Sequence, residues 1–242
     1  SFWSEVNEQT RLIFISHITS PTALAFPIAE ICQRARQAGI ITIVDGAHAP
    51  GQITLDLPAL GADIYVGACH KWLCAPKGSA FLYVREELIE MLDPLVISWG
   101  YESESPSGCK FIDYHEWQGT RDISAFLSVP AAIEFQAQHN WEAIRLECHR
   151  LATTTRDRIE ALTGLPSICD ETRFYQMFAA RLPEQIDPGM LKDALYDGFR
   201  IEVPIIVLNG EKFIRVSFQA YNSESDSETL IQALQVLLEP YL

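Results

Sequence analysis

Residues 40–48 read Ile40-Ile41-Thr42-Ile43-Val44-Asp45-Gly46-Ala47-His48, a run of strand-forming residues that ends on a carboxylate and a turn. Its near-continuous apolar character is typical of a parallel strand that is covered on both faces. A similar run from Arg11 to Ser16 precedes it, and between the two runs apolar residues recur at helical spacing from Ile28 to Ala38, with Gly39 as the end. Strand, helix and strand in this order predict a βαβ unit.

The same alternation continues toward the C-terminus. We expect further strands at residues 63–67, 79–84, 174–182, 200–208 and 212–218. We expect helices at residues 2–8, 55–60, 86–92, 123–138, 141–162, 188–196 (with Gly198 as its stop) and 225–238, and a loop over 98–118. Asn209-Gly210 predicts a hairpin between the last two strands, because this pair readily supplies the positive φ angles of a type I′ turn.

This order of elements predicts the fold class and two domains. Strands alternating with helices over residues 1–139 indicate an α/β domain with a mainly parallel sheet. Residues 140–242 read as a bridging helix followed by a small C-terminal α+β domain.

Composition excludes several classes of protein. The 242 residues are 48% hydrophobic and 21% charged with a net charge of −14, which is typical of a soluble globular chain and disfavours nucleic-acid binding. No run reaches the roughly 18 apolar residues of a membrane span, and the N-terminal residues lack the character of a signal peptide. We therefore expect a cytoplasmic protein with no membrane partner.

The six cysteines are scattered without a paired spacing. This pattern indicates neither a metal site nor a disulfide framework. We expect reduced thiols that are mostly buried.

Polar residues that can carry chemistry follow two of the predicted strands. Asp45 comes directly after the strand at 40–44, at the edge where open α/β sheets bind ligands, although an Asp-Gly pair also forms ordinary turns. The next strand leads into His70-Lys71-Trp72-Leu73-Cys74-Ala75-Pro76-Lys77-Gly78. Burial of Lys71 in such a rigid, apolar loop would favour the neutral amine that attacks a carbonyl. A facing Asp45 carboxylate would hold a pyridine nitrogen protonated and make the ring an electron sink.

These two segments and three others resemble one enzyme family in order and separation. The three others read Ser16-His17-Ile18-Thr19-Ser20-Pro21-Thr22, Gln118-Gly119-Thr120-Arg121-Asp122, and Arg215-Val216-Ser217 with Tyr221-Asn222. Together they are similar to the class V aminotransferase family, and most of all to its isopenicillin N epimerase-like branch. The resemblance covers the whole chain. It implies the fold of the pyridoxal-phosphate transferases of fold type I, the cofactor pyridoxal 5′-phosphate, an amino-acid substrate, and a homodimer with shared active sites.

The resemblance also implies roles for single residues. Lys71 would form the internal aldimine and shuttle the α-proton, Asp45 would pair with the pyridine nitrogen, and His48 would bond the ring hydroxyl. The remaining positions implied for binding are His70 and Thr19 at the cofactor, Thr120 at the phosphate of the neighbouring subunit, and Arg215 at the substrate carboxylate, while His17 would face the pocket.

Other interpretations of these residues stay open. His70 could be a packing histidine and Arg215 a surface arginine. Lys77 could be mistaken for the aldimine lysine, but its Pro-Lys-Gly turn resembles another part of the family's loop.

The chain departs from the family pattern in two places. Many relatives carry Ser, Thr or Asn where this chain has Ala68, which removes one expected phosphate contact. The family's phosphate loop and ring-stacking residue would lie upstream of Ser1. We therefore expect residues 1–139 to be a partial large cofactor-binding domain, with an N-terminal segment missing.

The reaction stays open among several alternatives. Cysteine desulfurases of this scaffold need a cysteine shortly before the Arg-x-Ser strand, and residues 198–218 contain none. Epimerisation, transamination and carbon–sulfur lysis remain, all starting at the α-carbon. A truncated, non-catalytic paralogue or interaction domain is the alternative from a different class.

Overall fold

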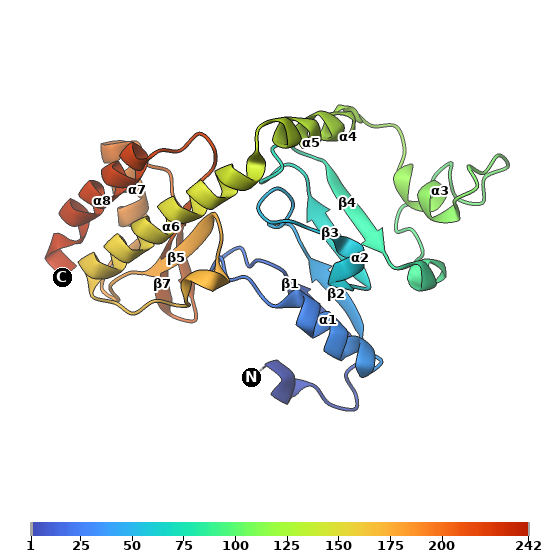
Figure 1. Ribbon diagram of the computed structural model, residues 1–242, viewed down its shortest axis with the longest axis horizontal. Helices are drawn as coiled ribbons and strands as arrows, with labels where there is room; N and C mark the ends of the chain where they lie inside the picture. The colour runs from blue at the N-terminus through green and yellow to red at the C-terminus, as the bar shows by residue number, and fades with distance from the viewer. Residues whose placement is uncertain (1, 242) are drawn as a thin grey trace.

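The computed structural model describes residues 2–241, which form two packed units joined by the long helix α6 (Trp141–Thr163) (Figure 1). The N-terminal unit holds a sheet in the order β1-β2-β3-β4. Strands β1 (Leu12–Ser16), β2 (Ile41–Asp45) and β3 (Ile64–Ala68) are parallel, and β4 (Ala80–Val84) runs antiparallel to β3. The predicted βαβ unit and the mainly parallel sheet are confirmed.

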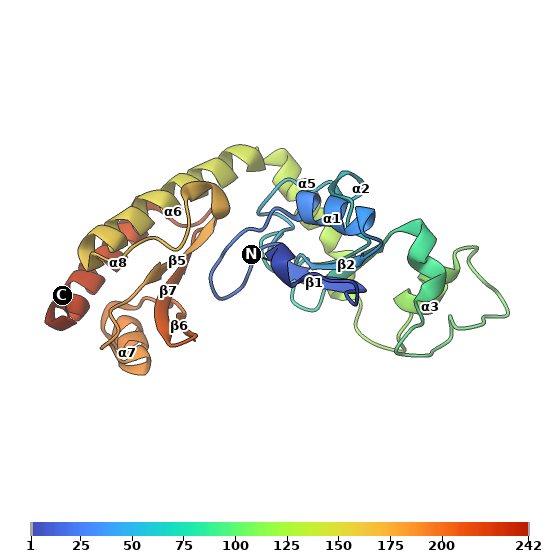
Figure 2. The ribbon, with the colours of Figure 1, turned by 90° about the horizontal axis from the view of Figure 1, so that it is seen from below.

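One face of this sheet is covered by helices. Helix α1 (Ile28–Gln37) and the short helix α2 (Leu57–Leu60) lie on the same side of it (Figure 2). The apolar residues of α1 fall three or four positions apart, so they form one stripe against the strands. The residues buried in this core include Ile28, Ile31, Cys32 and Ala35 of α1 and Ile13, Val44 and Tyr65 of the strands.

The opposite face of the sheet is largely bare. Phe14 is 67% exposed, and Leu12, Val66 and Leu82 are also exposed. The strand register places these side chains on one face, because Phe14 pairs with Ile43, Ile43 with Ile64, and Val66 with Leu82. A parallel sheet normally has helices on both faces, so this surface lacks its usual cover within the part of the chain described.

Several predictions in the rest of this unit are wrong in detail: the loop at 98–118 contains a helix, the helix at 123–138 is divided, the helix at 2–8 is a 3-10 helix that ends at Glu5, and the helix at 86–92 is also a 3-10 helix. The remaining elements are the 3-10 helices η1 (Phe2–Glu5) and η2 (Glu86–Met91) and the helices α3 (Lys110–Glu116), α4 (Ser124–Leu127) and α5 (Val129–Gln138). Helix α3 lies inside the predicted loop at 98–118. It buries no residue, so it carries no strong apolar periodicity. The predicted helix at 123–138 is divided at Ser128, because Pro130 fits the first turn of a new helix rather than the interior of a longer one.

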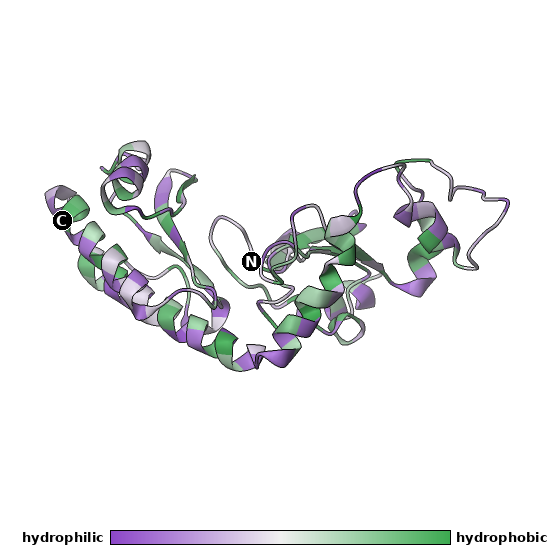
Figure 3. Ribbon diagram, turned by 90° about the horizontal axis from the view of Figure 1, so that it is seen from above, coloured by the Kyte–Doolittle hydropathy of each residue, from purple (hydrophilic) through white to green (hydrophobic). Residues whose placement is uncertain are grey.

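The C-terminal unit is an antiparallel sheet packed against helices. Strands β5 (Met177–Arg181), β7 (Glu211–Ser217) and β6 (Ile205–Leu208) are hydrogen-bonded in that order. Its other elements are α6, α7 (Pro188–Phe199), α8 (Glu224–Leu238), η3 (Glu171–Arg173) and η4 (Glu239–Tyr241). Figure 3 shows hydrophobic and hydrophilic residues alternating along α6, as a helix with one buried face requires. The core of this unit gathers residues of α6, α7 and α8 over β5 and β7.

Three ends predicted in this unit are wrong, and its hairpin is confirmed. The strand predicted at 174–182 begins only at Met177. Gly198 does not stop α7, which continues to Phe199 and ends where Arg200 takes a left-handed conformation at φ 57°. The strand predicted at 200–208 begins only at Ile205, after Pro204, which has no N–H to donate to a ladder. Asn209 and Gly210 have φ angles of 52° and 84° between β6 and β7, as a type I′ turn requires.

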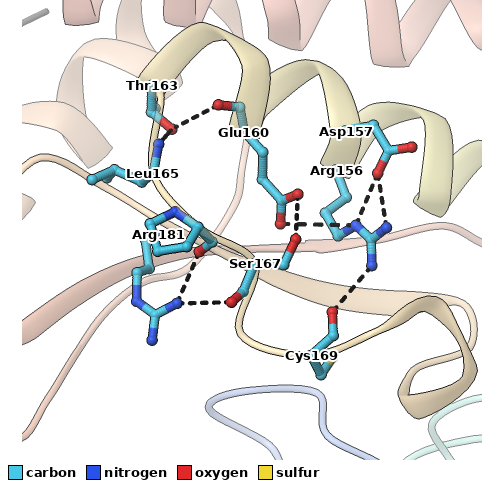
Figure 4. Close-up of polar contacts among 9 residues, drawn as sticks. Arg156, Asp157, Glu160, Thr163, Leu165, Ser167, Cys169 and Arg181 are labelled. Carbon is cyan, nitrogen blue, oxygen red and sulfur yellow. Dashed lines mark hydrogen bonds and ion pairs between the residues drawn. The ribbon is translucent and has the colours of Figure 1, made fainter.

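The loop from α6 to β5 is fastened by side chains of both elements (Figure 4). Ser167 Oγ donates to Glu160 Oε2 over 2.6 Å, and Arg181 Nη1 donates to the carbonyl oxygens of Pro166 and Ser167 over 2.8 and 3.0 Å. Arg156 Nη1 reaches the carbonyl of Cys169 at 3.5 Å. These contacts hold the loop against the C-terminal part of α6 and against Arg181 at the end of β5.

The cysteines are all free thiols, as expected, but their burial is mixed. Cys32, Cys69 and Cys148 are buried and Cys169 is partly so, whereas Cys74 and Cys109 are exposed.

Candidate active site

Asp45 lies at the carboxyl end of β2, the central position between two parallel neighbours. Its Oδ1 accepts a hydrogen bond from the Ala47 backbone N–H over 3.0 Å, and its Oδ2 accepts a long one of 3.4 Å from Ser16 Oγ. The following Gly46 is needed for close packing, since a Cβ there would lie 2.0 Å from the Tyr65 ring. Asp45 therefore forms the turn and also presents a carboxylate at the sheet edge.

Lys71 stands on the tight turn that follows β3. The Cys74 backbone N–H donates to the Lys71 carbonyl over 3.1 Å, and Cys74 has the left-handed φ of 63°. Burial lowers the pKa of the Lys71 amine, the Arg215 charge lowers it further, and the Asp45 carboxylate acts in the opposite direction. Asp45 and Arg215 thus both lie close enough to Lys71 to influence its pKa.

His48 is the nearest polar partner of that amine. Its Nε2 lies 3.1 Å from Lys71 Nζ, and its Nδ1 accepts a hydrogen bond of 3.2 Å from the Trp72 indole N–H. Burial chiefly lowers the pKa of His48 to about 4, helped by the positive charges of Lys71 and Arg215 and opposed by Asp45. The imidazole is therefore neutral at physiological pH.

Arg215 reaches the same cluster from the other unit. It lies on β7, and its Nη1 donates to the carbonyl oxygen and to Oγ of Ser20, over 2.6 and 3.0 Å. Its Nε is buried without a hydrogen-bond partner among the residues described, and burial lowers the pKa of the guanidinium. A desolvated arginine with donors to spare is suited to an anionic ligand.

Close packing and three buried glutamines join the two site segments. A Cβ at Gly51 would lie 2.4 Å from the Trp72 carbonyl carbon, so the backbones after β2 and β3 touch at this point. Gln52 Nε2 donates to the His48 carbonyl over 2.6 Å, and Gln52 Oε1 accepts from the Gln176 backbone N–H over 3.1 Å. Gln219 extends these links from Gln176 to the Trp72 carbonyl. Sequence reasoning missed all three glutamines, because they form no motif and lie far apart in the chain.

His17, expected to face the pocket, is buried, and its ring contacts Tyr65 rather than Lys71 or His48. Its Nδ1 lies 2.9 Å from the Tyr65 hydroxyl, and its backbone N–H donates to the Asp45 carbonyl over 2.8 Å. Burial lowers the pKa of His17 to about 4 and raises the pKa of Tyr65. The neutral His17–Tyr65 pair therefore stabilises the carboxyl end of β2 through the bond from His17 to Asp45.

The remaining expected ligands are less closely joined to the cluster. His70 is exposed, with Nδ1 3.3 Å from the Ser79 carbonyl. The Thr19 hydroxyl is occupied within its own loop by Thr22 and the Leu24 backbone. Thr120 is exposed in the loop between α3 and α4, and the structure records no hydrogen bond of its side chain to any described residue. Lys71 and Lys77 are both exposed, but among the residues described it is Lys71 whose amine lies within hydrogen-bond distance of His48.

Comparison with known proteins identifies the family of the chain. The Aminotransferase class-V family description matches residues 1–230. Isopenicillin N epimerase of Amycolatopsis lactamdurans is 40% identical over 240 residues, which are 95% of this chain and 60% of that protein. A probable chloroplastic L-cysteine desulfhydrase of Arabidopsis thaliana is 30% identical over 251 residues, covering 95% of this chain and 51% of that protein.

A solved structure has the same fold. A cysteine desulfurase of Escherichia coli superposes with a TM-score of 0.83 at 21% identity, over 100% of this chain and 62% of that one. The chain spans about 60% of the length of the two epimerases among its curated relatives. Its fold is that of the fold type I pyridoxal-phosphate enzymes. The chain belongs to the class V aminotransferase family, whose members depend on pyridoxal phosphate.

Proposed function

We propose that the protein binds pyridoxal 5′-phosphate covalently at Lys71 and acts at the α-carbon of an amino acid. One observation carries this proposal: an amine of lowered pKa lies 3.1 Å from His48 and within electrostatic range of both the Asp45 carboxylate and the Arg215 guanidinium. A nucleophilic amine, a carboxylate and a free arginine are the groups that an aldehyde, a pyridine nitrogen and a substrate carboxylate require.

The donor set fits this cofactor in its ring region. Asp45 would hold the ring nitrogen, and His48 would bond the ring oxygen. His70, Thr19 and Thr120 are the residues we assign to the phosphate, with Thr120 acting on the neighbouring subunit. When bound, the cofactor supplies an electron sink for negative charge at the α-carbon.

The chain's own residues then divide two tasks. Arg215 Nε has no hydrogen-bond partner among residues 2–241, and Nη2 makes no recorded hydrogen bond, so both can donate to a carboxylate and orient the amino acid. Lys71 Nζ, whose pKa burial lowers, can accept the α-proton as the neutral amine and return it. An epimerase, an aminotransferase and a carbon–sulfur lyase all need these two tasks.

The choice among these reactions is guided by the relatives. Two isopenicillin N epimerases are 40% and 36% identical to the chain, while the Arabidopsis desulfhydrase is 30% identical. The cysteine desulfurase reaction is disfavoured, because residues 198–218 contain no cysteine that could act as a nucleophile. Epimerase-like chemistry is the reaction best supported.

A homodimer in the cytoplasm is part of the same proposal. Leu95, Trp99 and Leu127 are strongly exposed around the segment that carries Thr120, and such apolar surface marks interaction sites. No helix among residues 2–241 has the length and apolar character needed to cross a bilayer. We keep residues 1–139 and 140–242 as the proposed boundaries of the partial large cofactor-binding domain and of the bridging helix with the small domain.

The bare face of the first sheet favours a second candidate. A chain that exposes Phe14 and Leu82 can act as an interaction domain, or can be inactive until another segment covers it. The experiment below separates this alternative from the enzyme.

Covalent labelling tests the proposed function. The protein is titrated with pyridoxal phosphate, followed by visible absorbance, reduced with borohydride and mapped by peptide mass. We expect the label on Lys71 and its loss in Lys71→Arg, with Lys77→Arg as the matched control that keeps the label. A label spread over surface lysines, or none, would favour the non-catalytic candidate.

A further inference from the structure

The indole of Trp72 and the amine of Lys71 approach opposite nitrogens of the His48 ring. Trp72 Nε1 donates to Nδ1 over 3.2 Å, and Lys71 Nζ lies 3.1 Å from Nε2. Trp72 and Lys71 are neighbours in sequence, and the turn that Cys74 closes points both side chains at one imidazole. We propose that Trp72 selects the Nε2–H tautomer of His48 and thereby favours the neutral form of the Lys71 amine.

Counting donors and acceptors leads to this assignment. An indole nitrogen can only donate, so Nδ1 of His48 must carry a lone pair. A neutral imidazole then bears its single proton on Nε2, which faces the lysine. A donor at Nε2 requires an acceptor opposite it, and Lys71 Nζ accepts only as a neutral amine.

The other protonation states leave a conflict at one of the two contacts. An imidazolium would place an N–H at Nδ1 against the indole N–H. A Lys71 ammonium would need a lone pair at Nε2, which His48 lacks once Trp72 has taken the lone pair at Nδ1. Only the neutral amine beside the Nε2–H imidazole satisfies both distances.

The indole is held firmly enough to impose this choice. Trp72 is only 7% exposed, and its carbonyl accepts a hydrogen bond from Gln136 Nε2 over 3.0 Å. Gly51 packs against the same carbonyl group on the other side. The Trp72 side chain itself packs in a buried cluster with Ile18, Ala23 and Met177, so rotation of the indole away from His48 would break this packing.

The charged groups around His48 do not produce this choice by themselves. Asp45 favours a proton on the imidazole, while Lys71 and Arg215 oppose it. None of the three charges distinguishes Nδ1 from Nε2 through a direct contact with Nδ1. Trp72 makes that contact, so it acts as a positioning residue for the His48–Lys71 pair.

One consequence rests on the proposed function. The same Nε2–H would be the donor offered to the cofactor's ring oxygen once Lys71 is engaged. The tautomer itself is a property of the chain without cofactor, so it can be measured independently.

Nitrogen NMR of the full chain tests the inference without cofactor. With ¹⁵N-histidine labelling, and the His48 signals assigned by their loss in His48→Gln, we expect Nδ1 unprotonated and Nε2 protonated. Trp72→Phe keeps a buried ring but removes the donor, and we expect a mixture of tautomers. Trp141→Phe is the matched control, because this equally buried indole donates to the Gly51 carbonyl over 3.1 Å rather than to His48.

The rate of Lys71 modification by pyridoxal phosphate gives the second measurement. Loss of one hydrogen bond corresponds to about a fivefold lower fraction of reactive neutral amine, so we expect about a fivefold slower rate in Trp72→Phe and an unchanged rate in Trp141→Phe.

The outcomes separate this inference from the proposed function. An unchanged His48 tautomer in Trp72→Phe would overturn the inference even if Lys71 still carries the label. A fixed Nε2–H tautomer in a protein that never labels Lys71 would support the inference and refute the proposed function. If Trp72→Phe does not fold, a His48 tautomer with its proton on Nδ1 in the unaltered protein would by itself refute the inference.

Discussion

The two units of the chain bury their apolar surface to very different degrees. The C-terminal sheet is covered on one face by α6 and α8, and Met177 on its other face packs with Ile18 and Trp72 of the first unit. Among residues 2–241, the N-terminal sheet is covered by α1 and α2 on one face, and it exposes Phe14 on the other. Burial of apolar area is the main stabilising term in folding, so we expect the unit that holds Lys71 and Asp45 to be the less stable of the two.

The residues of the candidate site therefore come from two units that differ in how much apolar surface they bury. Arg215 lies on β7 between the buried residues Ile214 and Val216. Asp45 ends β2 and Lys71 follows β3, and both strands belong to the sheet whose outer face is bare. A partner or further segment that covers that face would stabilise the unit that holds Asp45 and Lys71. It would leave the unit that holds Arg215 nearly unchanged.

A pair of phenylalanine substitutions tests the comparison with the largest expected effect. Phe178 of β5 is 1% exposed, so Phe178→Ala should cost about 3–5 kcal/mol of unfolding free energy. Phe14→Ser on the bare face should change it by less than about 0.5 kcal/mol and should reduce self-association. Urea unfolding and sedimentation measure both.

The same two variants can also show that the two units do not differ in this way. If Phe14→Ser costs as much as Phe178→Ala, the face that carries Phe14 is covered in solution and the two units are equally complete. Tyr83→Phe, on the helix-covered side, serves as a control that alters no apolar area.

Much of the fold could be predicted from sequence, because its strands are dense apolar runs with clear ends. The runs ending at Ser16 and Val44 predicted two parallel strands, and Asn209-Gly210 predicted the hairpin. Helix α3 could not be predicted, since it buries nothing and leaves no periodic signal. The bare sheet face was also unforeseen, because an apolar run does not reveal whether its cover belongs to the same stretch of chain.

The residues of the candidate site could be predicted only where they belong to a sequence motif. Asp45, His48, Lys71 and Arg215 were named from their segments, and the structure brings them together. The contact from Trp72 to His48 and the links through Gln52 and Gln219 were missed. They depend on which atoms face one another across two units, and residue types in a linear sequence do not encode this directly.

Acid should weaken the N-terminal unit through His17. Its pKa of about 4 lies below the ordinary value of 6.5, so the unfolded chain binds the proton more readily. Its contribution is therefore constant above pH 6.5 and falls as pH drops toward 4, by up to about 3 kcal/mol in total. Urea midpoints between pH 7 and pH 4 measure this loss.

The control for this acid effect is His17→Gln, which cannot take up the proton. We expect its stability to vary less with pH over the same window, although it is lower at pH 7 because the contact with Tyr65 changes. An equally steep decline in His17→Gln would show that another group governs the acid response, and His48 is the next to test because its pKa is lowered to about 4 as well.

Arg215→Ala separates the two sides of the site and has the smallest expected effect. Arg215 lies on the better-packed unit and Lys71 on the other, so loss of the guanidinium should weaken amino-acid binding by about tenfold to a hundredfold, as expected for a hydrogen bond to a charged group. Attachment of pyridoxal phosphate to Lys71 should persist, because the groups nearest to it, His48 and Asp45, remain. Ser20→Ala is the matched control, since it removes one acceptor of Arg215 and leaves the charge. Equal loss of cofactor attachment and amino-acid binding in Arg215→Ala would mean that Arg215 acts by holding the two units together, and the separation of roles between them would then be wrong.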